Sequence, residues 1–181
     1  MPLSTIVSLV FFVALLFYFF MGIYVLSLNI NSKLHRIFFL ICISLSIWSL
    51  SFSIANSAPT YDLCILWRRI SALGWGTMYS LILHFTLILT GKKKILKNKW
   101  FLVALYFPCI IKLYVFFLNK DMAAKQYNLI ETYAGWINIT KGTLWDILFS
   151  VYFLSYSIIS ISLAFSWGRK AKTENEKNNP T

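Results

Sequence analysis

Five long runs of apolar residues divide the chain, and this pattern limits the fold more than any other feature of the sequence. The runs cover about residues 3–28, 37–55, 66–89, 100–118 and 144–167. A helix of about 20 apolar residues crosses the hydrocarbon core of a bilayer. Charged residues make up only 13% of the 181 residues, so little of the surface suits water. The sequence therefore predicts an all-α integral membrane protein, a polytopic bundle of five transmembrane helices.

The basic residues between the runs predict the orientation of this bundle. Eleven Lys and Arg follow the first span, the third span or the fifth span, whereas three lie in the loop between the fourth and fifth spans. Short basic loops stay in the cytoplasm. We expect the N-terminus outside the cell and the C-terminus in the cytoplasm. The same distribution explains the net charge of +11, so nucleic acid is not expected as a partner.

The third span carries a stripe of small residues. Ala72, Gly76 and Ser80 recur every four positions, a spacing that lets helices approach closely in lipid. We therefore expect this span to be the packing centre of a membrane-embedded region that covers residues 1–168. Residues 169–181 form a polar cytoplasmic tail that is expected to be disordered.

Four charged residues are predicted at similar depth in the outer half of the membrane: Arg68, Arg69, Lys112 and Asp146. A charge at this depth requires a partner, a wet cavity or a path to the headgroups. One hypothesis is an outward-facing ligand pocket, in which Asp146 neutralises one cation and the excess positive charge binds an anionic group. The alternative is that the arginines reach lipid phosphates while Lys112 and Asp146 form a structural pair. His84, in the inner half, is expected to be a buried, hydrogen-bonded, neutral histidine.

The chain contains no motif for catalysis. It has no Gly-rich phosphate loop, no His–Glu zinc pattern and no nucleophile elbow. Its three cysteines, Cys42, Cys64 and Cys109, have no metal-ligand spacing. Catalytic residues, metal ligands and cofactors are therefore not expected in this chain.

Several short segments resemble a known family. They are Ile47-Trp48-Ser49-Leu50, the segment from Trp67 to Trp75, and His84-Phe85 followed by Leu89-Thr90-Gly91-Lys92-Lys93. Together they resemble the N-terminal seven-transmembrane sensory region of bacterial histidine kinases, which also precedes diguanylate cyclase and PAS modules. The resemblance extends from about Leu3 to Lys177. It implies a membrane-embedded sensory input without catalytic residues of its own, in a multi-pass protein of the bacterial cell membrane.

The chain differs from that family in having five predicted spans rather than seven. We interpret it as a form truncated before its last two helices and its output domain, so that any kinase or cyclase activity belongs to a downstream segment. The expected partners are the lipid bilayer and either a second copy or a signalling membrane protein; no ligand is identified. The alternative function is a small transport or permease-like subunit, and a product of a disrupted gene is a third interpretation.

Overall fold

A computed structural model describes residues 2–178, and the side chains of these residues except Lys93 and residues 171–178. The elements in chain order are α1 (Leu3–Leu28), α2 (Lys33–Asn56), α3 (Tyr61–Leu89), α4 (Lys93–Leu96), α5 (Lys99–Leu113), the π-helix η1 (Tyr114–Leu118), α6 (Lys120–Tyr127), β1 (Leu129–Thr132), β2 (Gly135–Asn138) and α7 (Leu144–Asn178).

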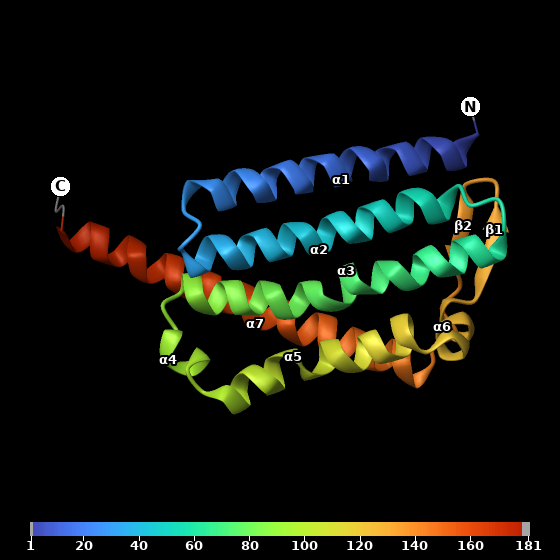
Figure 1. Cartoon of the computed structure of the whole chain (residues 1–181). Coiled ribbons are helices and arrows are strands. Elements are labelled where there is room, and N and C mark those ends of the chain that lie inside the picture. Colours follow the sequence, from blue (N-terminus) through green and yellow to red (C-terminus); the bar gives the residue numbers. More distant parts are fainter. Residues whose placement is uncertain (1, 179–181) are drawn as a thin grey trace.

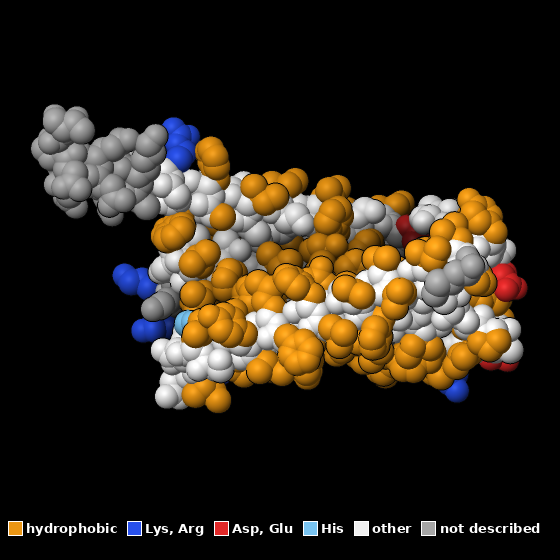
Figure 2. Space-filling view, turned by 90° about the horizontal axis from the view of Figure 1, so that it is seen from above, with side chains coloured by type: hydrophobic (Ala, Val, Ile, Leu, Met, Phe, Trp, Pro, Cys, Tyr) orange, Lys and Arg blue, Asp and Glu red, His pale blue; other side chains and the backbone are white. Residues whose placement is uncertain are grey.

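Five helical segments are long and apolar enough to cross a membrane, which confirms the predicted class. They are Leu3–Leu28, Lys33–Asn56, Tyr61–Leu89, Lys99–Leu118 and Leu144–Lys170. Large apolar side chains are exposed along them, and Figure 2 shows these side chains spread over the middle of the visible face. This surface is suited to contact with lipid, as expected of a multi-pass membrane protein.

Polar residues cap the starts of α2 and α3, and for this reason these two helices begin before their apolar runs. The Ser32 hydroxyl accepts a hydrogen bond from the amide of His35, and the Thr60 hydroxyl accepts one from the amide of Leu63. Such caps satisfy free amides of the first helical turn. Hydropathy alone does not detect them, because capping residues are themselves polar.

Helix α3 lies in the centre and packs against α2, α5 and α7, while α1 packs on the far side of α2 (Figure 1). Helices α2 and α3 approach each other closely at Gly74, where an added Cβ would overlap the backbone of Ser44 and lie 2.7 Å from the Cβ of Trp48. The Ser44 hydroxyl donates to the Gly74 carbonyl over 2.7 Å. The absence of a side chain at Gly74 therefore allows α2 and α3 to meet directly.

The segment between α5 and α7 folds over one end of the bundle as a cap made of α6 and an antiparallel hairpin. Strands β1 and β2 pair from Leu129 opposite Asn138 to Thr132 opposite Gly135. Gly135 has a φ of +100°, and an added Cβ would overlap the Asn56 carbonyl. The sequence did not predict this hairpin, which is the one non-helical element pair among residues 2–178.

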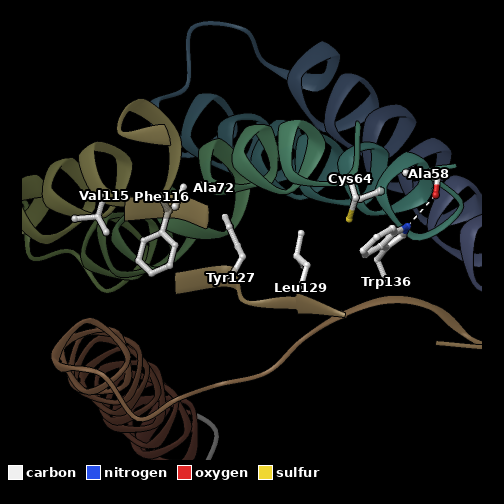
Figure 3. Packing of buried hydrophobic residues seen from close by; sticks show 10 residues of the cluster. Ala58, Cys64, Ala72, Val115, Phe116, Tyr127, Leu129 and Trp136 are labelled. Carbon is white, nitrogen blue, oxygen red and sulfur yellow. Dashed lines mark hydrogen bonds between the residues drawn. The ribbon is translucent and has the colours of Figure 1, made fainter. Parts of the chain in front are cut away.

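The cap contributes to the larger buried apolar cluster of the molecule (Figure 3). Tyr127, Leu129 and Trp136 of the cap pack toward Cys64 of α3 and Phe116 of η1. The indole nitrogen of Trp136 donates to the Ala58 carbonyl over 2.8 Å. Packing and this hydrogen bond together fasten the cap to the loop between α2 and α3.

Helix α7 continues without a break to Asn178, past the predicted end of the fifth span. The backbone of residues 169–178 is helical, and residues 179–181 lie outside the described part of the chain. The division of the chain at residue 168 and the predicted disorder of the tail stay predictions.

Candidate functional site

Arg68 of α3 is buried, with 3% of its surface exposed, and it connects three elements at the capped end. Its Nη2 donates to the Asn56 side chain over 2.9 Å and to the backbone carbonyl of Trp136 in β2. The guanidinium carbon lies 3.9 Å from the ring centroid of Phe52. The side chain therefore links α3 to the end of α2 and to the hairpin.

The backbone carbonyl of Arg68 makes a further connection, to α6. It accepts hydrogen bonds from the hydroxyl of Tyr127 over 2.7 Å and from that of Ser71 over 2.6 Å. Burial raises the pKa of Tyr127, so its hydroxyl stays protonated and remains a donor. Helix α6 and strand β2 of the cap thus both bond to one residue of α3.

No carboxylate of the described residues forms an ion pair with Arg68, and its Nε atom has no hydrogen-bond partner among them. Neutral acceptors and an aromatic face surround the charge instead. A buried cation that lost these contacts would be left unpaired in an apolar environment, which is strongly unfavourable. One of these acceptors, the Trp136 carbonyl, belongs to the cap, so opening of the cap would remove part of the hydrogen bonding of Arg68.

Arg69 points to a different element, the end of the π-helix η1. Its Nε and Nη2 donate to the Phe117 carbonyl over 3.0 and 2.7 Å. Helix ends leave carbonyls without partners, and a cation near a helix C-terminus also interacts favourably with the helix dipole. Arg69 thereby attaches the capped end of the fourth span to α3.

Lys112 and Asp146 are close in the fold but have separate partners. The buried Lys112 Nζ donates to the carbonyl of Trp145 over 2.7 Å and lies 5.3 Å from the ring centroid of Phe149. The Asp146 carboxylate accepts from the amide and hydroxyl of Thr143 over 2.8 and 3.0 Å, as in a helix capping box. Within the described part of the chain, no salt bridge joins Lys112 to Asp146.

The four predicted ligand residues do lie at the capped end, on α3, α5 and α7. The geometry nevertheless gives no support to a ligand pocket there, because protein groups accept the hydrogen bonds of Arg68, Arg69 and Lys112. None of the four residues lines any of three cavities found between the helices. Ligand binding by these residues stays a prediction without a described cavity.

The predicted small-residue stripe lies on the side of α3 that packs on α5 and α7. Ala72 and Ser80 are fully buried, and a Cβ on Gly76 would make ordinary contacts of 3.7 and 3.9 Å with Leu113 and Lys112. The Ser80 hydroxyl donates to the Leu105 carbonyl of α5 over 2.9 Å. The contact at Gly74, which is tighter than the one at Gly76, lies on the opposite side of α3 and faces α2.

Tyr152 of α7 contacts the α3 backbone between two of these small residues. Its hydroxyl accepts from the Ser80 amide over 3.0 Å and donates to the Gly76 carbonyl over 3.2 Å. In a regular α-helix the Ser80 amide would donate directly to the Gly76 carbonyl, because each amide pairs with the carbonyl four residues earlier. A side chain in this position can bend a helix. Tyr152 was not predicted as a functional residue, because its only signal in the sequence is a tyrosine in the middle of an apolar run.

A second tyrosine of α7 compensates for the proline of α5. Pro108 has no amide hydrogen, so the carbonyl of Ala104 loses its normal helical donor. The hydroxyl of Tyr156 lies 3.3 Å from that carbonyl and 3.0 Å from the carbonyl of Leu105. Neighbouring helices commonly satisfy such groups in membranes. α7 is therefore hydrogen bonded to the backbones of both α3 and α5.

The opposite end of α3 is open. His84 is half-buried and hydrogen bonded, with 2.8 Å between its Nδ1 and the hydroxyl of Tyr106 on α5. It lines a cavity of about 810 Å³ between α2, α3 and the α4–α5 segment. The hydrogen bond is the type expected from the sequence, whereas the adjoining cavity was not predicted.

The fold and these contacts define a class of protein: a polytopic helical membrane protein in which one central helix joins a capped end to an open, basic end. The chain belongs to the family described as the N-terminal 7TM region of histidine kinase, whose model matches residues 9–178. This match confirms the resemblance seen in the sequence. It identifies a sensor region and no catalytic domain. Comparisons with curated proteins and with solved structures gave no match.

Proposed function

We propose that this chain is a non-catalytic sensory input that converts a stimulus at the capped end into a change of helix packing at the basic end. The family match over residues 9–178 carries this proposal. An output domain or a partner protein in the cytoplasm would receive the change. Because the chain shows no motif for catalysis, the chemistry of signalling is assigned to that output.

The proposed orientation places the cap outside the cell and the α4 end in the cytoplasm. Its support is the distribution of charge along the chain, with basic residues concentrated around α4 and after the fifth span. Figure 2 agrees, since most of the visible Lys and Arg side chains lie at the α4 end and the acidic ones at the opposite end. A stimulus from outside would then act on the cap first.

The contacts of α3 offer a route for the signal. The cap is held to α3 at Arg68, and α7 is held to α3 at Tyr152 about 12 residues further along the helix. A shift of α3 caused by opening of the cap would change the Tyr152 contact and with it the position of α7. Helix shifts of about 1–2 Å are sufficient for signalling at packed interfaces.

A comparison of gene expression tests this function in the native host. One strain lacks the gene, a second carries Tyr152→Phe, and a control carries Tyr114→Phe, which alters an exposed tyrosine of η1. A sensor predicts that deletion and Tyr152→Phe alter the same limited set of transcripts, at equal membrane abundance, while the control does not. Altered uptake of a solute without a transcript response would favour the permease alternative instead.

A further inference from the structure

The cavity at the basic end has a charge pattern that indicates its ligand. Lys33 and Arg36 of α2 and Lys97, which follows α4, line its opening, and no carboxylate is among the lining residues. All three cations are exposed. The Arg36 Nη2 donates to the Asn31 carbonyl over 3.3 Å, which leaves its other donors available. The opening is therefore complementary to an anion.

The walls of the same cavity are apolar and belong to membrane-crossing helices. Ile37 of α2, Ile88 of α3 and Leu102 of α5 contribute to them. The volume of about 810 Å³ is within the range of about 300–1,000 Å³ that is usual for ligand sites. A ligand that fits must combine a negative group at the opening with an apolar part along the walls.

His84 adds a hydrogen-bonding group below the opening. It precedes the last residue of α3 by five positions, which is roughly 7–8 Å along the helix axis. Its Nδ1 is paired with Tyr106, and its Nε2 has no hydrogen-bond partner among the described side chains. An oxygen of the ligand between the charged group and the apolar part would be a suitable partner for this nitrogen.

We propose that this cavity binds an anionic phospholipid, with the phosphate-bearing headgroup on Lys33, Arg36 and Lys97 and an acyl chain along the apolar walls. Basic pockets between membrane helices favour such headgroups. A free phosphate shares the charge but has no apolar part for the walls. The site is independent of the proposed sensory role, because it requires only that the chain lies in a bilayer.

Native mass spectrometry of the full chain tests the proposal. The protein is released from nanodiscs that contain equal amounts of phosphatidylglycerol and phosphatidylcholine. We expect the wild type to retain phosphatidylglycerol selectively. The variant Lys33→Gln/Arg36→Gln/Lys97→Gln should retain about tenfold less phosphatidylglycerol than the wild type, because each basic residue near the membrane surface contributes to binding.

A control variant with the same loss of charge distinguishes lipid binding in this cavity from general electrostatic attraction of anionic lipid to the basic end of the protein. Lys94→Gln/Lys99→Gln/Lys170→Gln removes three cations from the same end that do not line the cavity. This control should retain the lipid as the wild type does. Equal loss in both triple variants would overturn the proposal, and so would retention of both lipids in proportion to their abundance.

A third variant tests the apolar part of the site without removing charge. Ile37→Trp fills the cavity from the α2 wall and should reduce retention of phosphatidylglycerol, with circular dichroism showing unchanged helix content. Retention equal to the wild type would contradict the acyl-chain placement. A parallel sample receives excess inorganic phosphate; retention should persist, whereas displacement of the lipid by phosphate would indicate a free-anion site and overturn the proposal.

Discussion

At the scale of residues, the buried cations have partners on other helices or in the cap. Arg68 donates to the Asn56 side chain and to the Trp136 carbonyl, and Lys112 donates to the Trp145 carbonyl. The location of these cations within apolar helices was predictable from hydropathy. Their partners were not, because backbone carbonyls leave no signal in the sequence. The predicted carboxylate partner, Asp146, caps its own helix instead.

The pairing of Tyr156 with the carbonyl freed by Pro108 leads to a prediction of non-additivity. Tyr156→Phe removes the hydroxyl near the Ala104 and Leu105 carbonyls and should destabilise the protein by about 1–2 kcal/mol. In a Pro108→Ala background, residue 108 again has an amide for Ala104, so the same change should have a smaller effect. Thermal unfolding in detergent of the four proteins of this double-mutant cycle measures the difference.

Equal losses from Tyr156→Phe in both backgrounds would contradict the assigned role of Tyr156. Ser155→Ala is a suitable control, because the Ser155 hydroxyl only bonds to the Tyr152 carbonyl within its own helix.

At the scale of elements, the helices were predictable, but the crowded contact between α2 and α3 was not. Ala72, Gly76 and Ser80 form the regular stripe, yet the glycine of α3 that is crowded by a neighbouring backbone is Gly74, which faces α2. Spacing identifies small residues, but only the neighbouring helix determines which of them is crowded. The hairpin was missed for a similar reason, because strands of four residues in a polar loop are too short to show a period.

The two glycines of α3 should therefore respond differently to the same substitution. Gly74→Ala places a Cβ against the Ser44 backbone and the Trp48 side chain and should destabilise by about 1–3 kcal/mol. Gly76→Ala meets only ordinary contacts and should be close to neutral, since alanine also favours the helix. Unfolding midpoints of the two variants in the same detergent provide the comparison. A larger loss at Gly76 would contradict the packing described for α3.

At the scale of the whole molecule, α1 and α2 form one side of the bundle and α5 and α7 the other, with α3 between them. The cap closes one end, and the α4 segment lies at the other (Figure 1). Residues that flank and follow α4 also line the basic cavity. This arrangement gives the proposed signal one continuous element, α3, that reaches both ends. It also makes the orientation in the membrane directly measurable.

Single cysteines test that orientation, in a background where the buried Cys42, Cys64 and Cys109 are replaced by alanine. Lys141→Cys lies in the loop after the hairpin, and Lys94→Cys lies in α4; both positions are exposed. A membrane-impermeant maleimide added to intact cells should label the first and not the second. Lysed cells should label both, which controls for accessibility. The reverse pattern in intact cells would place the cap in the cytoplasm.

The central claim is that α3 transmits a change at the cap to the basic end, and hydrogen–deuterium exchange of the full chain in nanodiscs tests it. Arg68→Lys preserves the charge but cannot reproduce the planar fork of donors, so the cap should loosen. We predict faster exchange in residues 56–69 and 127–138 and also in residues 91–99 around α4. Lys120→Gln, an exposed change on the cap, should leave both regions unaltered. Faster exchange confined to the cap, with residues 91–99 unchanged, would contradict the account.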